Sequence, residues 1–197
     1  MNHVYAFLCL LLIGSVGQVG AFNEADLEKL KSTNECNKCD FSGAKLEGAR
    51  LRATNLTEAN LTEANLTGAD FYRSNLTNAD LTGANLYKAN LEVVNLKGAN
   101  LAGANLIDIF MEDTNLQDAN LTGADLTKAY LEAADLTGTN LTNANLTGAV
   151  LEGTNLENAD LTDAVLTDGK LIWVKNLNKA ILCRTTMPDG TVNNSGC

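Results

Sequence analysis

Few residues in this sequence have side chains that could catalyse a reaction or bind a metal ion. Cys36 and Cys39 are separated by two residues, a spacing found in redox-active cysteine pairs and in one half of a zinc site. The sole histidine is His3, so a nucleophile paired with histidine, or a histidine-ligated metal, has no other candidate. The 24 Asp and Glu residues could supply paired carboxylates for acid–base work, provided that a cleft shifts their pKa values apart.

Charge and composition narrow the class of protein. With 14 Lys and Arg residues against 24 Asp and Glu residues, the net charge is −10, which gives no general attraction for a phosphate backbone and disfavours nucleic-acid binding. Aromatic residues make up 5% of the chain, too few for an ordinary core of rings, whereas 45% hydrophobic residues are too many for a disordered acidic chain. These figures predict a regular fold that buries many small apolar side chains.

The N-terminal segment has the pattern of a secretory signal peptide over residues 1–21. An apolar run over residues 4–13 is followed by Val19-Gly20-Ala21, which places small residues before a cleavage point after Ala21. The run is shorter than the roughly 20 residues of a membrane span, so we expect no membrane contact after cleavage. The first three residues lack the usual Lys or Arg. Cleavage would remove His3 and Cys9 and leave four cysteines in an oxidising compartment, which favours disulfides.

A five-residue repeat fills residues 39–168, giving 130 / 5 = 26 units without an insertion. The central residue is Leu in 23 units, and the residue two places earlier is Ala in 18 units. Alternation within a unit indicates a strand with Ala and Leu inward and Asn or Asp outward. Because five is an odd number, the chain must bend once per unit to keep Leu inside. Gly in ten units, two residues after Leu, fits the positive φ of a type II turn.

Units such as Ala59-Asn60-Leu61-Thr62-Glu63 and Ala119-Asn120-Leu121-Thr122-Gly123 resemble the pentapeptide-repeat family. The resemblance implies an all-β solenoid: a right-handed, quadrilateral β-helix with four repeat units per coil, hence 26 / 4 = 6.5 coils. The sequence supports this coil length independently, because departures from the consensus recur at a spacing of 4 × 5 = 20. Two such series are Phe110, Tyr130 and Val150 before Leu, and Glu92, Glu112, Glu132 and Glu152 after it.

Both flanks of the repeat are expected to cap the open ends of the solenoid. In the N-terminal cap, residues 22–38, Asn23 could begin a short helix with Leu27 and Leu30 on one side. In the C-terminal cap, residues 169–197, the bulky apolar residues from Leu171 to Leu182 predict a helix lying over the final coil.

The cysteines are better explained as structural than as reactive. No thioredoxin-like pattern surrounds Cys36 and Cys39, so a structural disulfide is favoured over a redox or zinc site. Four cysteines allow three pairings. We favour Cys36 with Cys39 and Cys183 with Cys197, because each pair is local and lies at one end of the rod.

A candidate partner surface follows from the exceptions to the repeat. Phe110, Tyr130 and Val150 replace outward Asn or Asp on successive coils and should form an exposed apolar strip. The competing interpretation is that these side chains merely pack on one another as a surface ladder, or beneath a terminal segment. Ile109, in a position usually filled by Ala, could make the strip a structural bulge. Charged residues at the same spacing run beside the strip on its own face: Glu112, Glu132 and Glu152. On the preceding face, Tyr87 and Ile107 stack at the same spacing.

The sequence therefore predicts a non-enzymatic scaffold or protein-binding module, exported to a periplasm or thylakoid lumen, with an unidentified protein partner and no cofactor. The glutamate series could bind divalent cations weakly, although a solvated acidic face is the simpler expectation. The alternative function is an acidic DNA-mimicking regulator that binds gyrase, which the family resemblance implies and which requires a cytoplasmic location.

Overall fold

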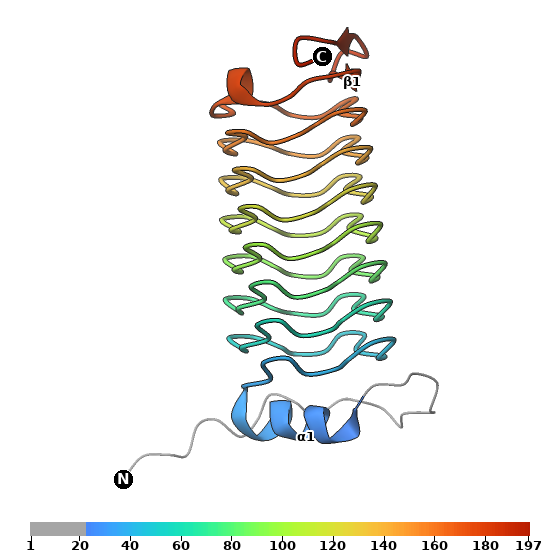
Figure 1. The fold of residues 1–197 in the computed structure, drawn as a ribbon, viewed down its shortest axis with the longest axis vertical. Coiled ribbons are helices and arrows are strands. Elements are labelled where there is room, and N and C mark those ends of the chain that lie inside the picture. Colours follow the sequence, from blue (N-terminus) through green and yellow to red (C-terminus); the bar gives the residue numbers. More distant parts are fainter. Residues whose placement is uncertain (1–22) are drawn as a thin grey trace.

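The computed structural model describes residues 23–197 as a rod of stacked coils (Figure 1). Helix α1 (Glu24–Thr33) closes one end. The other end carries the 3-10 helix η1 (Leu177–Lys179) and a hairpin of β1 (Thr185–Thr186) and β2 (Val192–Asn193), which pair antiparallel. The expected signal peptide, residues 1–21, lies outside the described residues. Among the residues that are described, no helix has the length and apolar character needed to cross a membrane.

The rod is a solenoid whose coils pair in parallel. An outward residue of each unit pairs with its equivalent four units later, as Asn60 does with Asp80, and such a bridge recurs in every unit. Four successive bridges return the chain to the same side, so each coil is four-sided. The Leu61 N–H donates to the Asp80 carbonyl at 2.7 Å, and equivalent bonds join each coil to the next. The solenoid expected from the repeat is confirmed.

The interior consists of the Leu and Ala positions, as the alternation predicts. Leu121 has no exposed surface and Ala124 is 1% exposed, whereas Asn120 and Thr122 are half-buried at the surface. Where Thr takes the Ala position it remains buried, and its hydroxyl donates to a backbone carbonyl. Thr154 donates to Leu131 of the preceding coil at 2.7 Å, whereas Thr54 donates to Leu51 of its own coil at 2.8 Å. Buried hydroxyl groups are therefore satisfied without disturbing the stack.

Each unit ends in a turn of the expected kind. The Ala44 N–H donates to the Phe41 carbonyl at 3.0 Å, and the residue before Ala44 has a positive φ. This position has φ 62° at Gly43, but it also has φ 59° at Val93, a β-branched residue. Positive φ is strained for a β-branched side chain, so the fold imposes this backbone conformation even where the residue type opposes it.

The coil does not stop at residue 168. Asn155 pairs with Lys175, a spacing of 175 − 155 = 20, whereas Asp160 pairs with Ile181, a spacing of 181 − 160 = 21. The extra residue falls in the segment that contains η1, after which the coil resumes up to Thr186. The helix expected over the final coil is therefore wrong: its bulky residues continue the turns and bridges, and helical structure is limited to the three residues of η1.

The N-terminal helix has the predicted cap and the predicted buried face. The Asn23 side chain accepts a hydrogen bond from the Ala25 N–H at 3.0 Å, and Leu27 and Leu30 are buried against the first coil. Asp26 fixes the helix to the rod, because its carboxylate accepts the Asp40 N–H at 2.8 Å. Helix α1 thereby covers the open end of the solenoid.

Candidate interaction surface

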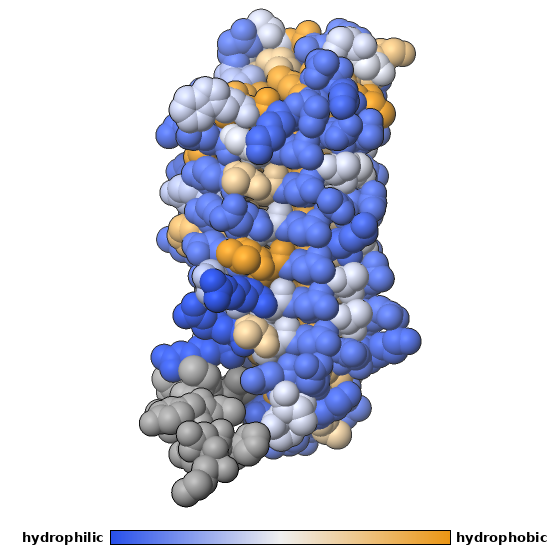
Figure 2. Space-filling view, turned by 90° about the vertical axis from the view of Figure 1, so that its left-hand side faces the viewer, coloured by the Kyte–Doolittle hydropathy of each residue, from blue (hydrophilic) through white to orange (hydrophobic). Residues whose placement is uncertain are grey.

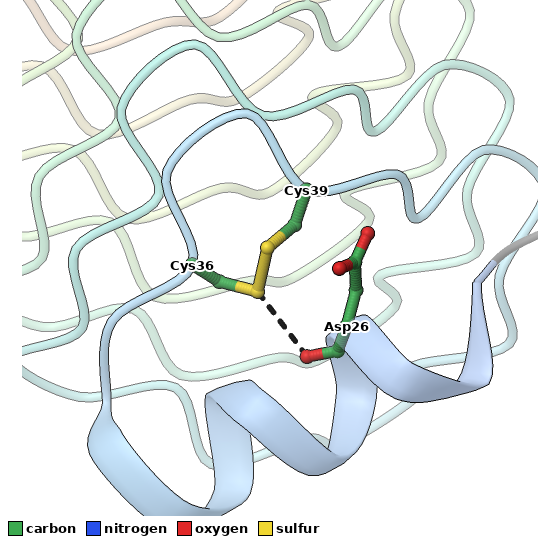
Figure 3. A group of neighbouring side chains, drawn as sticks. All are labelled: Asp26, Cys36 and Cys39. Carbon is green, nitrogen blue, oxygen red and sulfur yellow. Dashed lines mark hydrogen bonds between the residues drawn. A yellow bond between two sulfur atoms is a disulfide. The ribbon is translucent and has the colours of Figure 1, made fainter.

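Cys36 and Cys39 form a disulfide across the first turn of the solenoid (Figure 3). Cys36 occupies the Leu position of one further unit before residue 39, Cys39 occupies the Ala position of the first unit of the repeat, and both side chains are buried. The Cys36 sulfur lies 3.2 Å from the Asp26 carbonyl oxygen. Asp26, Cys36 and Cys39 form a cluster with metal-ligand residue types, but the two sulfurs are bonded to each other and offer no thiolate.

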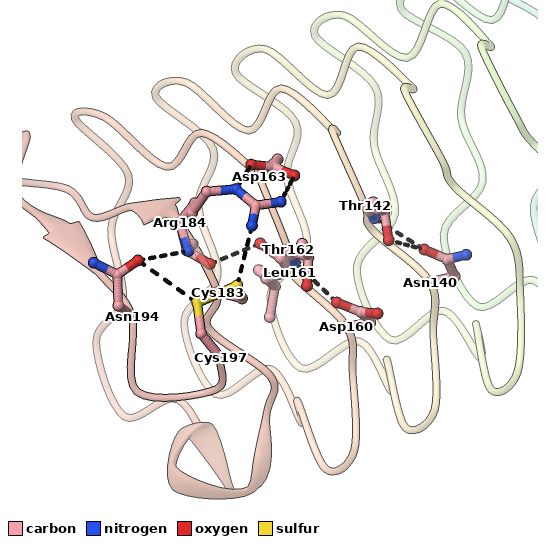
Figure 4. Close-up of polar contacts among 11 residues, drawn as sticks. Asn140, Thr142, Asp160, Leu161, Thr162, Asp163, Cys183, Arg184, Asn194 and Cys197 are labelled. Atoms are coloured by element: carbon pink, nitrogen blue, oxygen red, sulfur yellow. Dashed lines mark hydrogen bonds and ion pairs between the residues drawn. A yellow bond between two sulfur atoms is a disulfide. The ribbon is translucent and has the colours of Figure 1, made fainter.

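The second disulfide joins Cys183 to Cys197 at the C-terminal end (Figure 4). Beside it, the Arg184 guanidinium makes a two-pronged ion pair with Asp163, and this pairing lowers the pKa of the Asp163 carboxyl. The Arg184 N–H donates to the Asn194 side chain at 3.1 Å, which ties the last residues to the coil. These contacts secure the end of the chain.

A hollow of about 570 Å³ lies at this end of the rod. Its walls consist of apolar, amide and hydroxyl side chains: Val174, Asn176, Leu177, Asn178, Ala180, Leu182, Asn193 and Ser195. No ionisable side chain lines it, so the hollow offers no general acid or base.

The apolar strip, defined as Phe110, Tyr130 and Val150, occupies one side of three successive coils. Phe110 pairs with Tyr130 and Tyr130 with Val150 through parallel bridges. The two rings are stacked with their centroids 5.2 Å apart, and each residue is 37% exposed. Val150 is half-buried, so the exposed part of the strip is limited to the two aromatic residues. Ile109 and Met111 are both fully buried. Although Ile109 is larger than the usual Ala, Phe110 keeps its regular bridges to the neighbouring coils.

The glutamate ladder, defined as Glu92, Glu112, Glu132 and Glu152, follows the strip at the next corner. One carboxylate oxygen of Glu112 and one of Glu132 is buried without a hydrogen-bond partner. Burial raises the pKa of the Glu112 carboxyl; a backbone hydrogen bond opposes this rise, and repulsion from Glu92 and Glu132 adds to it. The ion pairs among residues 23–197 all use carboxylates outside the ladder.

Tyr87 and Ile107 lie at the corner before the strip. They are half-buried, and the Ile107 carbonyl accepts the Lys88 N–H at 3.1 Å, which joins their coils. The Tyr87 ring has its own cation, because the Lys88 Nζ lies 5.0 Å from the ring centroid. All eight candidate surface residues therefore flank one side of the four-sided rod.

Sequence reasoning missed three exposed residues of the same region. Val93 is 44% exposed and lies one residue after the first rung of the ladder. Ile172, which is 48% exposed, stands one coil after Glu152, and the Gly153 N–H donates to its carbonyl at 3.0 Å. Trp173 is 78% exposed and extends the Val93 column. The period alone could have found them, since 93 + 4 × 20 = 173.

We refer to the apolar strip, the glutamate ladder, Val93, Ile172 and Trp173 together as the mixed edge. Of the seven large apolar residues exposed within residues 23–197, five belong to it, and the other two, Ile181 and Val192, lie in the C-terminal segment. Figure 2 shows how exposed hydrophobic groups alternate with hydrophilic ones along a face of the rod.

The sequence matches the family profile of pentapeptide repeats (8 copies) over residues 35–71, 54–92, 95–132 and 129–168. The chain therefore belongs to the pentapeptide-repeat family. No curated protein sequence matches it.

Several solved structures are similar. HetL, a pentapeptide-repeat protein involved in heterocyst differentiation regulation in the cyanobacterium Nostoc, is 31% identical over 81% of this chain and 89% of its own, with a TM-score of 0.34. A pentapeptide-repeat protein from the Arabidopsis thaliana thylakoid lumen is 33% identical over 53% of this chain and 69% of its own, with a TM-score of 0.38. QnrB1, a plasmid-mediated fluoroquinolone resistance protein, is 23% identical over 72% of this chain and 79% of its own, with a TM-score of 0.42.

Proposed function

We propose that this protein is an exported, non-enzymatic pentapeptide-repeat module that binds a protein partner through the mixed edge. The concentration of exposed apolar residues on that edge is the observation that carries the proposal. Soluble proteins seldom leave contiguous apolar surface uncovered, and aromatic residues bordered by charge are typical of protein interfaces.

The composition of the interior supports a binding role over catalysis. The buried positions are filled by Leu and Ala, with Thr and Ser hydroxyls bonded to carbonyls of the backbone. The hollow at the C-terminal end has no ionisable lining. Function is accordingly assigned to the outer surface, where the repeat departs from its consensus.

Two features support export to a periplasm or thylakoid lumen. The signal-like pattern of residues 1–21 is the first. The second is the pairing of all four cysteines in the described part of the chain, because disulfides persist in oxidising compartments.

A DNA-mimicking regulator of gyrase is the alternative function. The glutamate ladder favours it, since the carboxylates form an axial row on an acidic rod. The alternative requires the protein to stay in the cytoplasm with free thiols, whereas the proposed function requires a processed chain with none.

Cell fractionation of the full-length protein, followed by N-terminal sequencing and thiol titration, tests the location. We expect an exported chain that begins at Phe22 and has no titratable thiol. Crosslinking in that compartment then compares the parent with the variant Phe110→Asn plus Tyr130→Asn. Val165→Asn is the matched control, because Val165 occupies the same repeat position on another side. Crosslinks lost only from the double variant support the proposal; a cytoplasmic chain, or unchanged crosslinks, contradict it.

A further inference from the structure

Over residues 23–197, the carboxylates and stacked rings of the mixed edge are not paired with cations, although Lys170 follows Val150 in the column of the strip and Arg73 stands one coil before Val93. The Tyr72 ring has Arg52 4.6 Å from its centroid, and Tyr87 has Lys88. Glu58, Glu157 and several aspartates are paired with Lys or Arg. Within residues 23–197, no basic side chain forms an ion pair with the glutamate ladder, and none lies over the stacked rings of the strip. A partner with basic and apolar groups would supply both missing contacts.

The spacing of the ladder selects the secondary structure of such a partner. Parallel coils repeat at about 4.8 Å, so its four rungs lie at about 0, 4.8, 9.6 and 14.4 Å along the rod. Residues i, i+3, i+7 and i+10 of a helix lie at about 0, 4.5, 10.5 and 15 Å along its axis, because the rise is about 1.5 Å per residue. Alternate residues of a strand are about 6.7 Å apart and lose register by the second rung.

The same helical face would also cover the apolar strip. Positions i+4, i+8 and i+11 lie beside the basic positions on a helix surface, which places aliphatic side chains next to a basic row. Phe110, Tyr130 and Val150 stand beside the ladder in the same order along the rod. A helix of about 13 residues spans the four coil intervals from Val93 to Trp173, roughly 19 Å.

We propose that the mixed edge binds a cationic amphipathic helix that lies parallel to the rod axis, with Lys or Arg at i, i+3, i+7 and i+10. The inference rests on the proposed function and specifies its partner. A second copy of this chain is disfavoured, because each copy carries a net charge of −10 and would oppose ladder to ladder. Residues 1–22 contain no Lys or Arg, so that segment lacks the required chemistry.

A synthetic helix provides the direct test. The probe is a capped, fluorescein-labelled peptide of about 14 residues, rich in Ala, with Arg at the four basic positions and Leu at i+4, i+8 and i+11. A control peptide has the same composition, with Arg at every second residue. Fluorescence anisotropy with the full chain gives the two dissociation constants. We expect the helical peptide to bind at least about tenfold more tightly, with affinity that falls as salt increases.

Variants of the protein localise the binding. Glu112→Gln plus Glu132→Gln should weaken the helical peptide about tenfold, whereas the control Glu47→Gln plus Glu63→Gln, two exposed acids elsewhere, should change it less than about twofold. Phe110→Asn plus Tyr130→Asn should weaken binding of the helical peptide, while its affinity should still fall as salt increases. Trp173 is the single tryptophan of the chain, so its emission should shift on binding. Thermal melts verify that each variant is folded.

The outcomes separate this inference from the function on which it depends. Equal binding of the two peptides, equal effects of the edge and control variants, or unchanged Trp173 emission at saturation would overturn the helical partner. If crosslinks to a native protein still require Phe110 and Tyr130, the proposed function survives and only the helix is rejected. If those crosslinks also persist in the double variant, both are rejected.

Discussion

Phe110 and Tyr130 are four repeat units apart in sequence, yet their rings stack with centroids 5.2 Å apart and planes inclined by 8°. The stack forms because parallel coils place equivalent residues directly above one another. It lies in the middle of the mixed edge and remains partly exposed. Its contribution to stability therefore has to be measured separately from its contribution to binding.

A double-mutant cycle isolates the stacking energy. Phe110→Ala and Tyr130→Ala each remove one ring, and the double variant removes both. Urea unfolding should give a coupling free energy of about 0.5–1.5 kcal/mol, the usual range for an aromatic pair. Strictly additive changes would show that the rings stand side by side without a stabilising contact.

The interior should be far more sensitive than the surface of the same unit. Leu121→Ala leaves a cavity in a fully buried column and should lower the free energy of unfolding by about 2–5 kcal/mol. Thr122→Ala removes a surface hydroxyl that donates to the Asn120 side chain at 2.6 Å and should cost about 1 kcal/mol. Denaturant unfolding of both variants measures the difference. Similar losses would contradict the inward packing of Leu.

Two substitutions at turn positions with positive φ should change the free energy of unfolding in opposite directions. Val93→Gly relieves a β-branched residue at φ 59° and should raise the free energy of unfolding by up to about 1 kcal/mol. Gly103 has φ 64° and no atom within 4 Å of an added Cβ, so Gly103→Ala should lower it by about 1 kcal/mol through backbone strain alone. Thermal melts measure both variants. A destabilised Val93→Gly variant would indicate that the Val93 side chain makes a stabilising contact.

The ladder should make stability depend on pH. Burial raises the pKa of the Glu112 carboxyl above its ordinary value of 4.5, so the folded protein binds that proton more tightly than the unfolded chain does. This contribution is fully present below pH 4.5 and is lost as pH rises through the folded-state pKa. The free energy of unfolding of Glu112→Gln should therefore equal that of the parent in acid. At pH 7 it should be higher than that of the parent, by less than about 1 kcal/mol because solvent screens the carboxyl group.

Urea unfolding of Glu112→Gln at several pH values, with Glu47→Gln as the control, measures this effect. The control should follow the parent at every pH, since Glu47 is exposed and outside the ladder. A Glu112→Gln variant that is less stable than the parent at pH 7 would show that the ionised carboxylate makes a favourable contact.

The repeat predicts most of the rod because each unit specifies its own inward residues and its own turn. Leu at 23 of the 26 central positions defines the interior, and the recurrence of exceptions at spacing 20 gives the register of the coils from the sequence alone. A single period thus connects local alternation to the contacts between coils. The strip and the ladder could be placed on one side of the rod for the same reason.

The C-terminal segment could not be predicted as well, because its large apolar side chains do not match the residue types of the repeat and instead indicate one face of a helix. Leu171 lies one unit after Leu166 and keeps the period, but Ile172 and Trp173 do not resemble a turn. The coil nevertheless imposes φ 51° on Trp173, and one additional residue near η1 shifts the pairing from 20 to 21. The exposed end of the mixed edge was missed with it.

A photo-crosslinking scan around one coil in the native compartment determines whether the mixed edge is the surface that binds the partner. A photoreactive amino acid is placed, one at a time, at positions 120, 125, 130 and 135, which are the outward bridge positions of the four sides. We expect a crosslinked partner from position 130, on the side of the apolar strip, and little or none from position 120 on the opposite side. Equal crosslinking from all four sides, or crosslinking confined to position 120, would contradict the assignment of the mixed edge as the binding surface.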